Sequence, residues 1–119
     1  MSSLELQSEI RAHSAWKHKF EFAIAGIQTE PLDAESAGDF TQCRLGQWLL
    51  ANGSRFAEHP MFQQLSATHT KFHHVASQIV SMVNDGKTAE ANTLLNADFN
   101  ALSETIVFQL QQMREIVNR

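Results

Sequence analysis

The chain has 119 residues, of which 43% are hydrophobic and 18% are charged, with a net charge of -4 and one cysteine. This length and apolar content indicate a single folded domain over residues 1–119 and argue against disorder. The acidic balance supplies no basic surface for nucleic acid, no apolar run approaches the roughly 20 residues that cross a bilayer, and one cysteine excludes an intrachain disulfide.

The N-terminal segment predicts a long helix. It starts after Ser2 or Ser3, where Glu5 would complete a capping box with Ser2, and it runs to about Gln28. Apolar positions recur every three or four residues, which is the spacing of one helix face. They are Ile10, His13, Trp16, Phe20, Ala23, Ile24 and Ile27, so a histidine shares the apolar face.

This pattern fails from Thr29 to Gln42, where proline, glycine and aspartate predict a connection without secondary structure. A short helix is expected from Cys43 to Ala51, with Asp39 or Thr41 capping its start. The dipeptide Asn52-Gly53 would end it.

Two further long helices follow. One has Pro60 in its first turn and an apolar face of Phe62, Leu65, His69, Phe72, Ala76, Ile79 and Val83. After a turn at 84–87, the last helix runs from about Thr88 to the C-terminus, with a face of Leu94, Leu95, Leu102, Ile106, Leu110, Met113 and Val117. We therefore predict an all-α four-helix bundle of three long antiparallel helices and one short helix that carries Cys43.

His69 and His73 are the most informative pair. Residues four apart lie about 6 Å from each other on one helix face, so both imidazoles can reach one metal ion. A closed zinc site needs two more ligands, and His13 and Cys43 are the best candidates. Three imidazoles and one thiolate suit zinc, and four protein ligands leave no position for a catalytic water.

The other three histidines are not expected to bind the metal. His18 lies off the first apolar face, His59 precedes Pro60 as a cap or loop residue, and His74 points about 100° away from His73. Trp16 and Trp48 are expected to serve packing.

Interpretations without a metal also exist. Each histidine could be a core residue bonded to a carbonyl, and Cys43 could be a small buried hydrophobe. Burying several unpaired imidazoles would cost a few kcal/mol, which favours a metal that accepts their lone pairs. Alternatively, Cys43 could be a nucleophile paired with a histidine, but such a site needs an orienting third group and a cleft, and the sequence indicates neither. We therefore expect no enzyme.

These residues resemble the CZB family, the chemoreceptor zinc-binding domain of bacterial signalling proteins. The family pattern is a histidine on the first helix, a Cys-x-x-Gly-x-Trp-like motif, and His-x-x-x-His on a later helix. The chain matches with His13, then Cys43-Arg44-Leu45-Gly46-Gln47-Trp48, then His69-Thr70-Lys71-Phe72-His73. Gly46 in this motif would allow the short helix to approach its neighbour closely.

The resemblance implies a cytoplasmic four-helix-bundle sensor that binds zinc through His13, Cys43, His69 and His73. Its input would be zinc or oxidation of the zinc-bound cysteine, and its partner a chemoreceptor or a diguanylate cyclase effector. The N-terminus, Met-Ser-Ser-Leu-Glu-Leu, lacks the pattern of a secretory signal, and a lone cysteine suits a reducing cytoplasm.

The sequence of the last helix also indicates that the chain forms an oligomer. Its apolar surface is larger than one bundle face requires, so we expect a homodimer through helical faces without nucleic-acid or membrane partners. The residues concerned are Leu94, Leu95, Leu102, Ile106, Phe108 and Leu110. The alternative function is a structural, zinc-stabilised helical dimerisation domain without sensing. A cysteine-dependent redox enzyme is the third interpretation.

Overall fold

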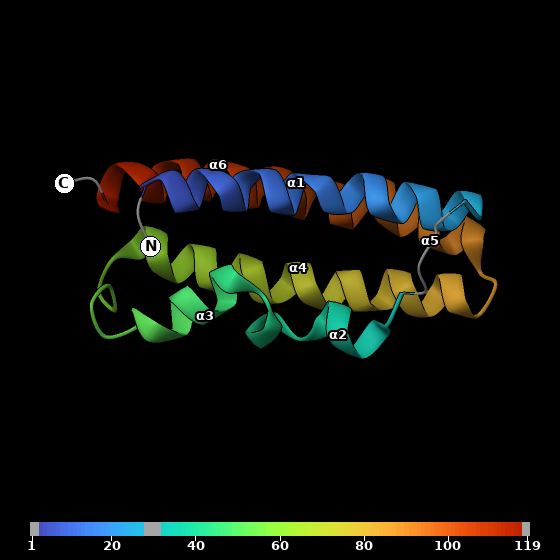
Figure 1. Cartoon of the computed structure of the whole chain (residues 1–119), viewed down its shortest axis with the longest axis horizontal. Coiled ribbons are helices and arrows are strands. Elements are labelled where there is room, and N and C mark those ends of the chain that lie inside the picture. The colour runs from blue at the N-terminus through green and yellow to red at the C-terminus, as the bar shows by residue number, and fades with distance from the viewer. Residues whose placement is uncertain (1–2, 28–31, 118–119) are drawn as a thin grey trace.

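The computed structural model describes residues 3–27 and 32–117, and every regular element among them is helical. The long helices α1 (Ser3–Ala25) and α4 (Pro60–Asn84) are diagonal partners in the bundle, and α6 (Asn100–Val117) lies between them. The fourth side holds the short helices α2 (Ala34–Gly38) and α3 (Arg44–Ala51), which pack on α4 (Figure 1). Successive sides run antiparallel, so the predicted all-α four-helix bundle is confirmed.

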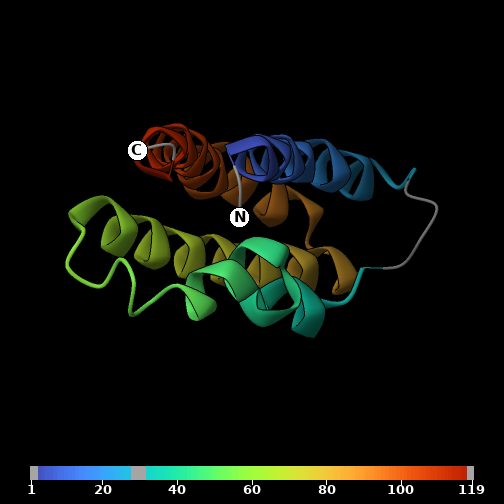
Figure 2. The ribbon, with the colours of Figure 1, turned by 60° about the vertical axis from the view of Figure 1, so that its left-hand side comes forward.

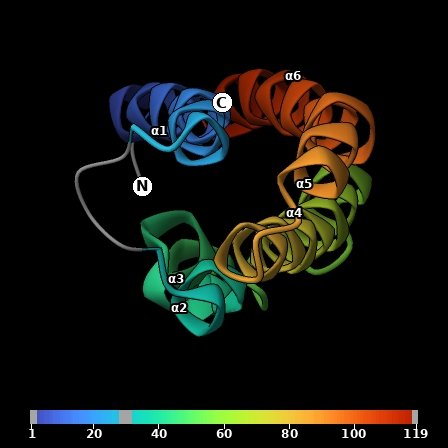
Figure 3. The same cartoon turned by 90° about the vertical axis from the view of Figure 1, so that its right-hand side faces the viewer.

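The bundle consists of two layers. In Figure 2, α1 and α6 lie side by side in one layer, and α4 lies with α2 and α3 in the other. The end-on view of Figure 3 shows α1 facing α2 and α3 across the remaining side, where contacts between elements are sparse. None of the helices in the described ranges is both long and apolar enough to cross a membrane.

Left-handed glycines end the two long helices α1 and α4. Gly26 has φ +77°, and the N–H groups of Gly26 and Ile27 donate to carbonyls in the last turn of α1. Gly86, with φ +79°, ends α4 in the same way. The first helix therefore stops before the predicted Gln28, which, like Ser2 of the proposed capping box, lies outside the described residues. Ile27 is 64% exposed, so its predicted place on the buried face is wrong.

The segment between α1 and α3 contains more structure than predicted. The carboxylate of Asp33 accepts hydrogen bonds from the N–H groups of Glu35 and Ser36 and thereby caps α2. Asp39 caps a 3-10 turn, Phe40–Gln42, rather than α3. The N-cap position of α3 is held by Cys43 itself, which corrects the predicted cap at Asp39 or Thr41. The prediction that this connection lacks secondary structure is therefore wrong for residues 34–42.

The last long element is not one regular helix. A π-helical turn, Leu95–Phe99, separates α5 (Thr88–Leu94) from α6. Fully buried side chains lie four residues apart at Ala91 in α5 and at Leu95 and Phe99 in this turn, a spacing wider than the 3.6 residues of an α-helical turn. The wider turn keeps these side chains on the core side.

Aromatic rings connect the two layers next to the histidine cluster described below. Phe99 contacts Phe72 of α4 and Phe20 of α1, with ring centroids 4.8 and 5.1 Å apart. Phe72 in turn contacts His13, with centroids 5.3 Å apart. This packing holds α1 and α4 at the separation at which their histidines meet.

Candidate metal centre

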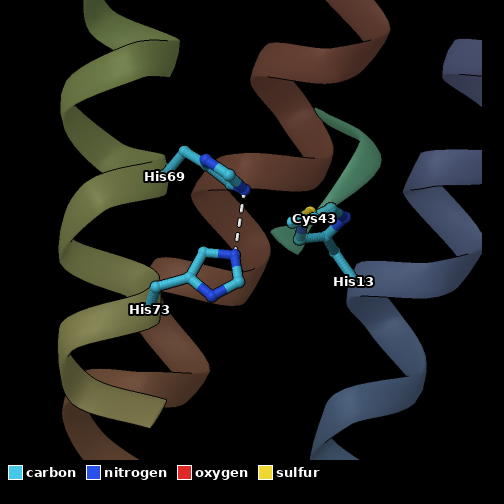
Figure 4. Close-up of side chains that lie close together, drawn as sticks. All are labelled: His13, Cys43, His69 and His73. Atoms are coloured by element: carbon cyan, nitrogen blue, oxygen red, sulfur yellow. Dashed lines mark hydrogen bonds between the residues drawn. The ribbon is translucent and has the colours of Figure 1, made fainter. Parts of the chain in front are cut away.

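Four side chains from three elements converge inside the bundle. His13 comes from α1, Cys43 from the start of α3, and His69 and His73 from α4 (Figure 4). One ligand atom from each residue can be chosen so that all four lie within 4.8 Å of one another. The histidines are only 1–2% exposed, whereas Cys43 is half-buried. The structure thus brings together all four residues that the sequence singled out.

The spacing of these atoms fits zinc. Nε2 of His69 and Nε2 of His73 are 3.0 Å apart, and Sγ of Cys43 lies 3.6 Å from Nε2 of His13. Zinc bonds of about 2.0–2.1 Å to nitrogen and 2.3 Å to sulfur place tetrahedral ligand atoms about 3.3–3.6 Å apart. These two separations lie close to this range, and the donor set of three imidazoles and one thiol is one that zinc prefers.

Backbone carbonyls orient two of the rings. Nδ1 of His13 lies 2.8 Å from the carbonyl oxygen of Glu9, and Nδ1 of His73 lies 2.8 Å from that of Ala37. In the tautomer that satisfies these carbonyls, Nδ1–H donates and Nε2 keeps its lone pair. Both lone pairs therefore face the cluster, as in protein zinc sites whose ligands are held by backbone acceptors.

Burial keeps the imidazoles neutral. It lowers the pKa of His13 and of His73, and together with the neighbouring His73 and His13 it lowers that of His69 to about 3. For His73, the Asp39 carboxylate and the Ala37 carbonyl oppose the effect of burial. Only a neutral imidazole has a free lone pair, so the rings are ready to bind a metal at neutral pH.

Cys43 is the N-cap residue of α3 and contributes its thiol to the cluster. Burial raises the pKa of its thiol, while hydrogen bonds from the N–H groups of Gly46 and Leu45 lower it. A Cβ atom at Gly46 would lie 1.8 Å from the carbonyl oxygen of Phe40, so any side chain there would push α3 off the preceding turn. The close approach predicted for Gly46 is confirmed, and its neighbour is this turn.

Glu9 is a buried residue of the site that the sequence reasoning missed. Its side chain is 5% exposed, accepts a hydrogen bond from the N–H of Leu45 and faces the Arg44 guanidinium. Burial is the largest influence on this carboxyl and raises its pKa. Its position four residues before His13, on the same helix face, was the available signal. Glu9 links α1 to the start of α3 beside Cys43.

The remaining histidines and the tryptophans lie outside the cluster. His18 and His74 are exposed, and His59 occupies the N-cap of α4. Trp48 packs with Phe56 and Phe62, with centroids 5.9 Å from each. Trp16 is half-buried and contacts the His73 ring edge to face, with centroids 5.7 Å apart.

Comparison with known families adds an independent observation. The family model described as the chemoreceptor zinc-binding domain, CZB, matches residues 13–80, more than half of the chain. This chain belongs to the CZB family. The matched range begins at His13 and encloses Cys43, His69 and His73, and CZB domains are regulatory zinc-binding domains rather than a known enzyme family. Neither the curated proteins nor the solved structures contain a match to the chain.

Proposed function

We propose that this CZB domain is a zinc-binding regulatory domain of bacterial signal transduction that responds to zinc or to oxidation of Cys43. The supporting observation is that three separate elements bring His13, Cys43, His69 and His73 into one closed cluster. We further infer that residues 1–119 form one cytoplasmic domain, which acts without catalysis as a homodimer. Its output partner is a chemoreceptor or a diguanylate cyclase.

The metal-binding residues lie where they control the docking of α3. When bound, zinc would join donors on α1, at the start of α3 and on α4. Direct contact between α1 and α3 is limited, so His13, Cys43 and the Glu9 hydrogen bond to Leu45 form much of the link between them. Residues 39–53, which contain the 3-10 turn and α3, are the segment whose position depends most on this link.

Cys43 also provides a chemical input. A peroxide transfers one oxygen atom to the thiolate sulfur, giving a sulfenic acid and hydroxide. The oxidised sulfur is a weaker donor, so oxidation and zinc depletion loosen the same segment. Half-burial leaves the sulfur within reach of a small oxidant.

Two alternative functions predict different experimental behaviour. A purely structural zinc site would release the metal only when the bundle unfolds, whereas a regulatory site exchanges zinc with the fold intact. A redox enzyme working through Cys43 would turn over a substrate.

Elemental analysis of the purified protein tests the proposal directly. We expect about one zinc per chain because the four ligands form one closed site. A preparation without zinc that also takes up none on titration would refute the proposed function. Zinc exchange measured alongside circular dichroism then separates regulation from a structural role.

A further inference from the structure

A cavity of about 350 Å³ opens between α1 and α2 and reaches the candidate metal centre. Cys43 and His73 line it, together with Trp16 and Phe20 of α1 and Ala37 of α2. His13 and His69 do not line it. The cavity lies on the side of the bundle where Figure 3 shows α1 facing α2. A small solute can therefore meet two of the four ligands without passing through the core.

Charged side chains of both signs line this cavity. Asp33 and Asp39 belong to the α2 side, and Lys19 belongs to α1, where its ammonium lies 5.5 Å from the Trp16 ring centroid. The Asp39 carboxylate is near enough to act electrostatically on His73. A dication entering here is attracted by the carboxylates and repelled by Lys19.

A second, smaller cavity of about 180 Å³ reaches His69 from another side. Its lining contains no charged side chain among the described residues and consists of Phe40, Leu49, Leu50, Ser66, His69 and Thr70. A hydrated dication gains no electrostatic compensation there for the water it must lose. Size, charge and access to two ligands therefore all favour the first cavity.

We propose that the cavity between α1 and α2 is the route by which Zn²⁺ enters and leaves the centre, with Asp39 drawing the cation in and Lys19 opposing it. This inference rests on the proposed zinc function. Cys43 and His73 are the first ligands that an incoming ion meets, and the last that it leaves. Asp39 is not itself a ligand; it sets the rate of zinc exchange through its charge.

Stopped-flow uptake of Zn²⁺ by the metal-free chain of residues 1–119 tests this route at low ionic strength. Asp39→Asn removes the charge but keeps an oxygen that can accept the Thr41 N–H, so the 3-10 turn stays capped. We expect this variant to take up zinc about threefold more slowly, and Lys19→Gln to take it up about threefold faster. Both differences should vanish at roughly 0.5 M salt, because mobile ions screen charges at that concentration.

Three controls change the charge elsewhere. Asp98→Asn removes a negative charge and Lys71→Gln a positive charge beside a different surface hollow. Both variants should take up zinc at the wild-type rate. Thr70→Lys adds a positive charge at the second cavity and should also leave the rate unchanged. A rate that falls for Thr70→Lys and not for Asp39→Asn would place the route at the second cavity and overturn the inference.

The remaining outcomes separate this inference from the proposed function. Zinc uptake at equal rates in the wild type, Asp39→Asn and Lys19→Gln would overturn the route and leave the zinc site standing. Changes of the same sign in both variants would indicate altered structure instead of steering, and would also overturn it. No uptake by the wild-type protein would refute the zinc function itself.

Discussion

Cys43 and its three histidine partners differ in what they must do with their protons when a metal binds. Burial raises the pKa of the Cys43 thiol and lowers that of all three imidazoles, so at neutral pH the thiol is protonated and the rings are neutral. Zinc binds thiolate and neutral imidazole. The thiol is thus the group that must lose a proton.

Proton release on zinc binding is therefore a residue-level prediction. At pH 7 we expect about one proton per zinc, measured with a pH indicator in weak buffer, and nearly none from Cys43→Ser at saturating zinc. Release of two or more protons would show that histidines are charged in the metal-free protein.

The ligand assignment predicts unequal effects of similar substitutions. Cys43→Ser or His73→Ala removes one of four donors and should weaken zinc binding at least about 100-fold, a loss of about 3 kcal/mol or more by the conversion of 1.4 kcal/mol per tenfold. His74→Ala is the matched control one residue away, and its side chain is exposed. Competition with a chromogenic chelator measures both. If His74→Ala abolished binding and His73→Ala did not, the assigned helix face would be wrong.

Stability of the metal-free protein should depend on pH in one direction. The folded-state pKa of His69 is about 3, below its ordinary value of 6.5, so the unfolded chain binds more protons between these values. The stabilising contribution is complete above pH 6.5 and is lost as the pH falls towards 3. Urea unfolding at several pH values should show this loss, and His69→Gln should reduce it. A free energy of unfolding that stayed constant from pH 7 to 4 would contradict the burial argument.

The sequence predicted these four residues because their signals are local. His69 and His73 share a face by spacing alone, and His13 interrupts an apolar face. Glu9 was missed because a glutamate in a helix is usually solvated, and its burial depends on where the N–H of Leu45 comes to lie. Such a position is a property of the packed molecule.

At the level of elements, segment 39–53 should respond most to the state of the centre. Hydrogen exchange compared among zinc-loaded, metal-free and peroxide-treated protein should show loss of protection there, because Cys43 anchors the segment to α1 and α4. Residues of α4 beyond the cluster, such as Ile79 and Val80, are fully buried and provide the internal reference. Equal protection of 39–53 in all three forms would leave zinc as a structural support only.

Elements with regular apolar spacing were predictable, and two irregular ones were not. The bounds of α4 follow from Pro60 and Gly86. By contrast, α2 is five residues long and has no periodic face, although the cap at Asp33 was visible in the sequence. The π-helical turn reflects three-dimensional packing, since Phe99 had to reach Phe20 and Phe72.

The whole molecule is elongated, with principal extents of 46 × 23 × 20 Å, and leaves apolar side chains on its surface. Phe108 of α6 is 56% exposed and is available to the predicted homodimer, whereas Leu95, Ile106 and Leu110 are fully buried in the core. Light scattering should give the mass of two chains, and Phe108→Glu should shift it towards one. Leu50→Glu on α3, where the side chain is 62% exposed, is the control and should leave the mass unchanged. A wild-type monomer at high concentration would contradict the prediction.

The position of Trp16 has a consequence for spectroscopy. The chain contains two tryptophans and no tyrosine, so excitation at wavelengths too long for phenylalanine gives emission from the indoles alone. Trp48 lies in an aromatic group with Phe56 and Phe62, whereas Trp16 touches the His73 ring and lines the cavity between α1 and α2. In a Trp48→Phe protein excited in this way, the emission would come from Trp16 beside the ligands. The fold thus contains its own fluorophore, which can follow occupancy of the centre in real time without a label.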